Sequence, residues 1–330
     1  MHMEYRQLGA CGPTVPAIGL GFWSIGGAFG PVDPQEVRRT IACAIERGAT
    51  LFDTAPAYGA AEELLGAALS PSDRSRIFLT TKCGLAPDPL IRGLTLDSRP
   101  HALRRHLLDS LKRLRCDWVD LLLLHWPDAS VPVAEAVSGL DALRREGLTR
   151  YIGVSNFSAA QLREACRVAP IVCNQVGYNL FDRRWERAMF PTAAELGVAV
   201  VAYSPLANGL LSGSFDGSRL HPQDWRMHGD TLSSQRLFAP ENVRHNVALA
   251  WQMAERFTLP RVTLPQVAIA WALAHPLIAS VITGSQRVER LEENLGALDI
   301  SMDDEMRSEL TWLGSMAHGL HDALPVWTSG

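Results

Sequence analysis

The sequence predicts an α/β protein folded as a (β/α)8 TIM barrel, with an N-terminal β-hairpin and an extra C-terminal helix. Short apolar runs alternate with longer amphipathic stretches, at the spacing typical of parallel βα units. Eight such units follow one another, and no Pro-, Gly- or Ser-rich linker divides them, which favours a closed barrel over an open sheet. We therefore expect one domain over all 330 residues.

The expected strands are short apolar runs, and each is followed by a stretch with helical periodicity. The N-terminal hairpin is expected to join residues 5–8 to a strand ending at Val15, through Cys11-Gly12-Pro13. The eight barrel strands are expected at residues 18–21, 50–53, 77–82, 119–125, 151–155, 172–178, 199–203 and 280–282.

The expected helices carry ordinary start and stop signals. Asp33 and Ser158 stand where capping side chains are favoured, and Gly48, Gly147 and Gly197 follow the ends of helices. Two segments exceed the usual loop length: 207–240 after the seventh strand, and a C-terminal extension over 302–330. The helices are expected at 34–47, 61–69, 100–114, 133–146, 159–167, 184–195, 241–257, 264–274 and 303–313.

Composition narrows the class of protein. The net charge of -4 argues against a general nucleic-acid or anionic-membrane binder. No apolar stretch is long enough to span a bilayer, and the N-terminus lacks a secretory signal, so we expect a cytoplasmic protein. The six cysteines are scattered and form no C-x-x-C pair, which indicates neither a zinc site nor a dithiol motif.

Four polar residues stand at or just past the ends of three consecutive apolar runs: Asp53, Tyr58, Lys82 and His125. All strand carboxyl ends of such a barrel open onto the catalytic face, so these side chains are expected to meet there. A neighbouring ammonium favours a phenolate, so Lys82 is expected to lower the pKa of Tyr58 from its usual ~10. Tyr58 would then act as general acid on a carbonyl oxygen, without a metal.

Each of these residues taken singly also has an ordinary structural interpretation, such as a cap, a packed tyrosine or a salt bridge. Their occurrence at three successive strand ends favours a catalytic site. The segment from Leu51 to Gly59 resembles the aldo-keto reductase pattern of a strand-end aspartate followed five residues later by a tyrosine. Thr81-Lys82-Cys83 and Leu123-Leu124-His125-Trp126-Pro127-Asp128 resemble the lysine and histidine blocks of that family.

The resemblance implies an NADP(H)-dependent oxidoreductase of a bacterial aldo-keto reductase branch, which reduces aldehydes or ketones to alcohols. Tyr58 would donate the proton, Lys82 and Asp53 would assist it, and His125 would orient the carbonyl oxygen. Gly19-Leu20-Gly21 lacks the third glycine of a Rossmann fingerprint, so the dinucleotide is expected across the barrel mouth instead.

The resemblance also implies the cofactor contacts. Ser155, Asn156 and Gln175 would bind the carboxamide, and Tyr203 would stack on the nicotinamide ring. The pyrophosphate would lie along Ser204, Leu206 and Gly209. The 2'-phosphate and adenine would be held by Gly284, Ser285, Arg290, Glu293 and Asn294.

We predict NADPH as the cofactor, with NADH left open because Thr283 and Gln286 depart from the family pattern. Arg287 and Arg290 lie three residues apart at a helix start, where a phosphate is well bound. The alternative interpretation of this segment is an exposed helix whose glutamates, Glu289 and Glu293, neutralise the two arginines.

The substrate is expected to be a small sugar-like or aromatic carbonyl compound. Trp23, Ala57 and Trp126 are predicted to form the pocket wall, and Trp225 and Trp327 are further candidates. A regulatory or binding subunit with little turnover remains an alternative, as does a dehydrogenase that oxidises alcohols or sugars. A hydrolase using Asp53 and Asp128 is disfavoured, because a lysine and a tyrosine occupy the centre. The oligomeric state is left open.

Overall fold

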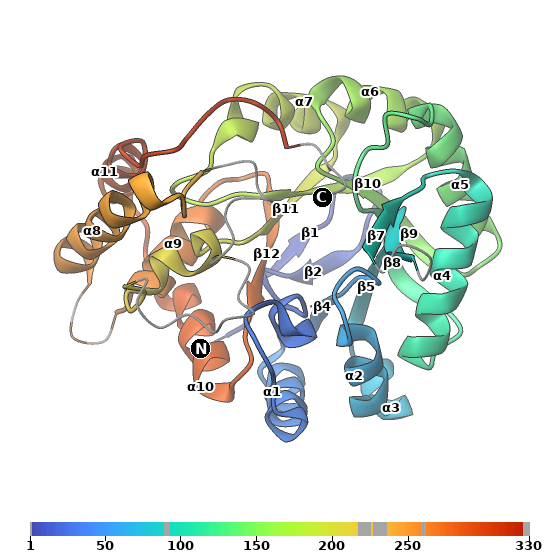
Figure 1. The fold of residues 1–330 in the computed structure, drawn as a ribbon, viewed down its shortest axis with the longest axis horizontal. Coiled ribbons are helices and arrows are strands. Elements are labelled where there is room, and N and C mark those ends of the chain that lie inside the picture. Colours follow the sequence, from blue (N-terminus) through green and yellow to red (C-terminus); the bar gives the residue numbers. More distant parts are fainter. Residues whose placement is uncertain are drawn as a thin grey trace.

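The computed structural model describes residues 2–88, 93–216, 226, 236–258, 260 and 262–325. Eight parallel strands close into a barrel in the order β10-β11-β12-β3-β4-β5-β8-β9, which confirms the predicted TIM barrel. Figure 1 shows the helices arranged around these strands. The barrel strands are β3 (Ile18–Gly21), β4 (Leu51–Asp53), β5 (Phe78–Cys83), β8 (Val119–Leu124), β9 (Thr149–Ser155), β10 (Ile171–Gly177), β11 (Ala199–Tyr203) and β12 (Ile278–Gly284).

The helices follow the predicted order. The Asp33 side chain accepts from Gln35 N and the Ser158 side chain accepts from Gln161 N, as capping residues do. Gly48 ends the first helix with a φ of 81°, a left-handed conformation that glycine adopts without strain. The helices are α1 (Pro34–Arg47), α2 (Ala61–Ala68), α3 (Pro71–Arg74), α4 (Pro100–Leu114), α5 (Val133–Arg145), α6 (Ala159–Val168), α7 (Met189–Leu196), α8 (Pro240–Phe257), α9 (Leu264–Leu273), α10 (Val288–Leu295) and α11 (Asp304–Gly314).

The predicted N-terminal hairpin is present and fills one end of the barrel. β1 (Tyr5–Gln7) pairs antiparallel with β2 (Thr14–Pro16). Leu8 and Val15 of this hairpin are fully buried in one cluster with inward-facing barrel residues such as Leu121 and Val201. A second, larger apolar cluster lies between the barrel and its helices. The interior is therefore a packed core that supports the site.

One local prediction needs correction, and two other segments hold structure that the sequence pattern does not predict. The helix expected over 184–195 is broken, because Ala188 has a φ of -133° between a 3-10 turn (Arg184–Arg187) and α7. No strand is expected between residues 83 and 99, but β6 (Leu85–Asp88) and β7 (Gly93–Leu96) form an antiparallel hairpin there. In the long segment 207–240, Ala207–Ser212 form a kinked 3-10 turn whose backbone is non-helical at Asn208 and Gly209. Trp225 and Trp327 lie outside the described residues, so their place in the pocket wall stays a prediction.

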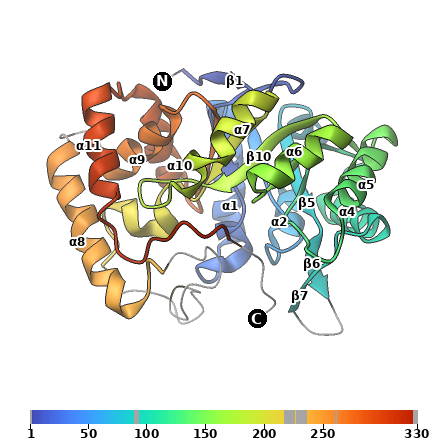
Figure 2. The same ribbon diagram turned by 90° about the horizontal axis from the view of Figure 1, so that it is seen from above.

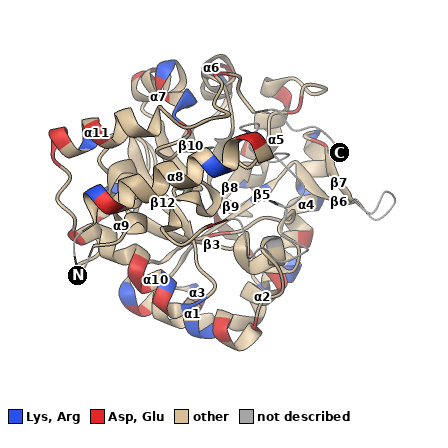
Figure 3. Ribbon diagram, turned by 60° about the vertical axis from the view of Figure 1, so that its left-hand side comes forward, with Lys and Arg blue, Asp and Glu red and all other residues tan. Residues whose placement is uncertain are grey.

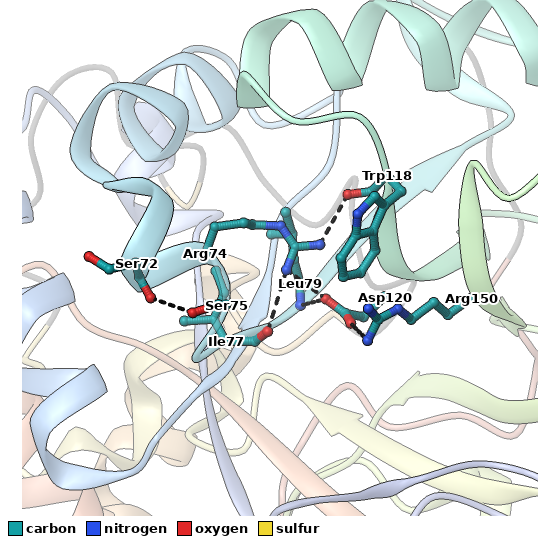
Figure 4. Close-up of polar contacts among 8 residues, drawn as sticks. All are labelled: Ser72, Arg74, Ser75, Ile77, Leu79, Trp118, Asp120 and Arg150. Carbon is teal, nitrogen blue, oxygen red and sulfur yellow. Dashed lines mark hydrogen bonds and ion pairs between the residues drawn. The ribbon is translucent and has the colours of Figure 1, made fainter.

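Asp120 ties several elements together at the amino-terminal end of β8. One carboxylate oxygen accepts from Arg74 Nη1 at 2.9 Å and from Leu79 N at 2.9 Å, and the other lies 3.5 Å from Arg150 Nη1. Both guanidinium groups lie over the Trp118 indole, with the Cζ atoms of Arg74 and Arg150 at 4.1 and 3.8 Å from its ring centroid (Figure 4). These contacts lie at the end of the barrel opposite the strand carboxyl ends, where structural roles are expected.

The chain after α11 crosses from one side of the barrel to the other. It first contacts α8, where His245 Nε2 lies 3.0 Å from Met316 O. It then reaches Arg184, whose Nη1 donates to Ala323 O at 2.6 Å. Figure 2 shows this segment in dark red. Figure 3 shows residues of both charge signs on outer helices such as α1 and α11. Among the described residues, no helix is long and apolar enough to cross a membrane.

Candidate active site

A cavity of about 610 Å³ opens at the carboxyl ends of the barrel strands. Three of the four residues singled out from the strand ends, Asp53, Tyr58 and His125, line it directly. Lys82 lies immediately beneath them, fully buried. The four side chains predicted to meet are therefore brought together at one end of the barrel.

Asp53 and Lys82 form a buried ion pair. Asp53 is the last residue of β4 and Lys82 lies on the neighbouring strand β5, so the parallel pairing of these strands places the two side chains together. Lys82 Nζ donates to Asp53 Oδ1 at 2.5 Å and to the carbonyl oxygen of Thr54 at 3.0 Å. Burial lowers the pKa of Lys82, while Asp53 opposes this shift.

Tyr58 and His125 lie above this ion pair. The ammonium nitrogen of Lys82 is 4.9 Å from the centroid of the Tyr58 ring, and the rings of Tyr58 and His125 meet edge to face at 5.6 Å. Burial, followed by the charge of Lys82, lowers the pKa of His125 well below its usual value. The imidazole is therefore neutral near pH 7 and can donate from one ring nitrogen only.

The expected direction of the Tyr58 pKa shift is wrong. Burial and the nearby Asp53 carboxylate raise the pKa of Tyr58 well above its usual value. The hydrogen bonds of the Lys82 ammonium go to Asp53 and to the carbonyl oxygen of Thr54. The phenol therefore keeps its proton near neutral pH, which suits a proton donor.

The residues predicted to bind a carboxamide form one polar cluster beside this group. Ser155 Oγ donates to Gln175 O at 2.9 Å, and Asn156 Nδ2 donates to Ser155 Oγ at 3.1 Å and to His125 O at 3.3 Å. Tyr203 Oη donates to Asn156 Oδ1 at 2.9 Å. The Tyr203 ring lies over Gly177, where an added Cβ would come within 3.2 Å of it. Amide donors and acceptors beside an aromatic face fit a nicotinamide ring and its carboxamide.

The loop after β11 has the backbone expected of an anion site. Ser204, Ala207 and Asn208 have positive φ values of 52°, 47° and 54°, which cost energy in non-glycine residues and cluster at functional sites. Arg226 Nη1 donates to Asn208 O at 2.9 Å, and an added Cβ at Gly209 would come within 2.7 Å of this nitrogen. The predicted channel residues Ser204, Leu206 and Gly209 all line the cavity, so the loop and Arg226 fit a pyrophosphate.

The adenosine end is only partly in the cavity. Gly284 lines it, and Ser24 Oγ beside it is buried without a hydrogen-bond partner among the described residues. Ser285, Arg290, Glu293 and Asn294 do not line the cavity. Asn294 Nδ2 donates to Ser285 Oγ at 3.1 Å, and Arg290 pairs with Glu293 at 2.7 Å, as the salt-bridged alternative expected.

The predicted substrate residues Trp23, Ala57 and Trp126 all line the cavity. Sequence reasoning missed several other lining residues, because hairpin pairing and loop packing bring them there without a sequence signal. Leu85 and Leu94 come from the β6–β7 hairpin. Polar lining residues that it did not name include Ser24, Asn179, Asp182 and Arg226.

The comparison with protein families matches residues 17–313 to the model described as "Aldo/keto reductase family". The chain is 31% identical to the NADH-specific methylglyoxal reductase of Escherichia coli K12, over 96% of this chain and 99% of that protein. It is 34% identical to a probable voltage-gated potassium channel subunit beta of Arabidopsis thaliana, over 90% of this chain and 92% of that one.

Solved structures resemble the whole fold. A glycerol dehydrogenase from Gluconobacter oxydans superposes with a TM-score of 0.81 at 29% identity, over 97% of this chain and 98% of that one. The holo form of an aldo-keto reductase from Bacillus halodurans superposes with a TM-score of 0.77 at 27% identity, over 98% and 100% of the two chains. The similarity thus extends over nearly all of both chains.

Proposed function

Because the chain belongs to the aldo/keto reductase family, we propose that it is an NADP(H)-dependent oxidoreductase that reduces small aldehydes and ketones to alcohols. The family is one of oxidoreductases that act on carbonyl compounds with nicotinamide cofactors. The observation that supports the proposal most is the meeting of an acid, an amine, a phenol and an imidazole beside a carboxamide-sized polar cluster.

In the proposed reaction, bound reduced nicotinamide supplies a hydride to the carbonyl carbon. Tyr58 donates the phenolic proton to the carbonyl oxygen, since its raised pKa keeps that proton in place near neutral pH. Lys82, with its ammonium 4.9 Å from the ring centroid, stabilises the phenolate left behind. Asp53 fixes the ammonium, and neutral His125 donates a hydrogen bond that orients the oxygen.

NADPH is the proposed cofactor. Arg290 is proposed to bind the 2'-phosphate of NADPH, because an arginine fork pairs well with a phosphate dianion. Arg290 forms an ion pair with Glu293, which lies three residues later on α10. This pair keeps the guanidinium near the start of α10, where a phosphate is also favoured. The relative in Escherichia coli is described as NADH-specific, which makes the relative use of the two cofactors the first quantity to measure.

The proposed substrates are small carbonyl compounds with a sugar-like or aromatic substituent. The cavity places the indoles of Trp23 and Trp126 together with Leu85 and Leu94, a surface on which an aromatic ring or the apolar face of a sugar can stack. Asp182 also lies on the cavity wall, where its two carboxylate oxygens accept from Arg184 at 2.7 and 2.8 Å.

A panel of aldehydes, ketones and the matching alcohols, assayed with NADPH and NADH on wild type and Tyr58→Phe, tests the function. We expect Tyr58→Phe to fold and bind cofactor, and to lose carbonyl reduction by about 10²- to 10⁴-fold. Near-normal turnover by this variant would remove the proton donor from the proposal. Cofactor binding without turnover by wild type would favour a binding subunit, a role that the name of the relative in Arabidopsis thaliana suggests for that protein.

A further inference from the structure

The side chain of Gln175 connects the proposed carboxamide site to the buried ion pair. Gln175 lies on β10, across the barrel from Asp53, and its Nε2 donates to Asp53 Oδ2 at 2.7 Å. The other oxygen of the same carboxylate accepts from Lys82 at 2.5 Å. Asp53 and Gln175 have only 3% and 2% of their surface exposed, so water does not replace either contact easily.

The chemistry of the contact fixes which way the Gln175 amide points. An ionised carboxylate can only accept hydrogen bonds, so the NH2 group of Gln175 must face Asp53. The carbonyl oxygen Oε1 is then the end left to meet a ligand, since Gln175 also lines the cavity. The neighbouring acceptor Asn156 Oδ1 already receives the Tyr203 hydroxyl. Oε1 is thus well placed by its chemistry to accept from the NH2 of a carboxamide.

The family resemblance already implies that Gln175 contacts the cofactor carboxamide. We propose that Gln175 is in addition a positioning residue, whose N–H fixes Asp53 against Lys82 and so couples the carboxamide site to the buried ion pair. The inference rests on the proposed function and deepens it. A carboxamide bound to Oε1 would fix the Gln175 side chain. That side chain would in turn fix the Asp53 carboxylate, which holds the Lys82 ammonium beneath Tyr58.

Loss of the Gln175 amide has two separate expected effects. Oδ2 of Asp53 would lose its donor, and a buried acceptor without a partner makes the local arrangement less favourable. The carboxylate would then turn away from its present geometry, and the Lys82 ammonium would be less well supported. The cofactor carboxamide would at the same time lose an acceptor for its NH2 group.

The first experiment measures binding alone, by quenching of tryptophan fluorescence. Wild type and Gln175→Met are titrated with NADP⁺ and with its 3-acetylpyridine analogue, in which a methyl group replaces the carboxamide NH2. We expect wild type to bind the analogue about tenfold more weakly than NADP⁺, which corresponds to one lost hydrogen bond. Gln175→Met should discriminate between the two by less than about twofold.

The second experiment measures the pH dependence of kcat for carbonyl reduction. Gln175→Met should move the alkaline limb of the profile to lower pH by about one unit, because the ammonium loses support. Ser155→Ala is the matched control: Ser155 belongs to the same polar cluster, donates to the backbone oxygen of Gln175 and accepts from Asn156 Nδ2, and neither hydrogen bond involves the Gln175 side chain. This control should weaken binding and leave the limb in place.

Gln175→Glu separates the two roles further. It keeps an acceptor for the carboxamide and, once ionised, repels Asp53, so it should retain the discrimination against the analogue while its alkaline limb moves. Equal discrimination by wild type and Gln175→Met, or an unmoved limb in both variants, would overturn the coupling while leaving the proposed function intact. Wild type that quenches with neither dinucleotide would overturn both.

Discussion

The ammonium of Lys82 lies 2.5 Å from Oδ1 of Asp53, and at most 5% of either side chain is exposed. A buried charge pair of this kind is strongly interdependent, because removing one partner leaves the other charge without compensation. Burial already lowers the pKa of Lys82, and the charge and hydrogen bond of Asp53 are the largest influences that oppose this shift. The protonation of Lys82 thus depends on its neighbour.

We therefore expect Asp53→Asn to lose most of its carbonyl reduction and to show an alkaline limb of kcat at lower pH than wild type. The sign follows from the loss of the group that raises the pKa of Lys82, so the ammonium gives up its proton earlier as the pH rises. Profiles of kcat from pH 6 to 10 measure this. A limb that stays at the wild-type position would show that Lys82 does not set it.

The cofactor preference is predicted to depend on Arg290. Arg290→Ala should lower kcat/KM with NADPH about tenfold and leave kcat/KM with NADH within about twofold, because only NADPH carries the 2'-phosphate. Arg47→Ala is the control, since Arg47 lies on α1 and forms an ion pair with Glu292, which lies on α10 like Arg290. Equal losses with both cofactors in Arg290→Ala would place the 2'-phosphate elsewhere.

The meeting of Asp53 and Lys82 could be predicted because parallel barrel strands bring their carboxyl ends to one face. A side chain at a strand end is thus placed by the fold alone, and Ser155, Gln175 and Tyr203 follow the same rule on β9, β10 and β11. The helix caps at Asp33 and Ser158 are equally local, since each depends on two or three adjacent residues.

The features that sequence reasoning missed depend on contacts between distant segments. Leu85-Ala86-Pro87 contains a proline, which weakens any strand pattern, and its pairing with residues 94–96 is needed to make it a strand. Arg226 is held at the cavity by a hydrogen bond to Asn208 O and by contacts with the rings of Phe29, Phe215 and Phe238. All four partners lie more than ten residues from it in the sequence. The direction of the Tyr58 pKa shift depends on burial, which the sequence pattern does not measure.

Asp120 is predicted to matter for stability without affecting the chemistry. Asp120→Ala should lower the free energy of unfolding by about 3 kcal/mol, because Arg74 and the Leu79 amide lose a buried partner (Figure 4). Urea unfolding followed by circular dichroism measures it, and kcat of the folded variant should match wild type. Asp109→Asn, which removes only an exposed pair with Lys112, is the control and should change stability by less than about 0.5 kcal/mol. A loss of kcat in folded Asp120→Ala would contradict a purely structural role.

His106, at the base of the β6–β7 hairpin, is predicted to make a contribution to the stability of the fold that is lost in acid. Its Nδ1 accepts from Gly84 N at 3.3 Å, and burial, followed by the charge of Arg105, lowers the pKa of His106 to about 4. An unfolded histidine titrates near ~6.5, so the unfolded chain binds more protons between these values. The stability that His106 contributes is therefore full above about pH 6.5 and is lost as the pH falls toward 4, by about 3 kcal/mol.

His106→Gln removes this titration and keeps a side-chain oxygen that can accept from Gly84 N. We expect its free energy of unfolding to fall less steeply than that of wild type between pH 7 and 4.5, measured by urea unfolding at several pH values. His101→Gln changes an exposed histidine on the same helix and should follow the wild-type curve. If His106→Gln also followed the wild-type curve, the imidazole would not be held neutral against Gly84, and other groups, such as His125, would carry the acid sensitivity.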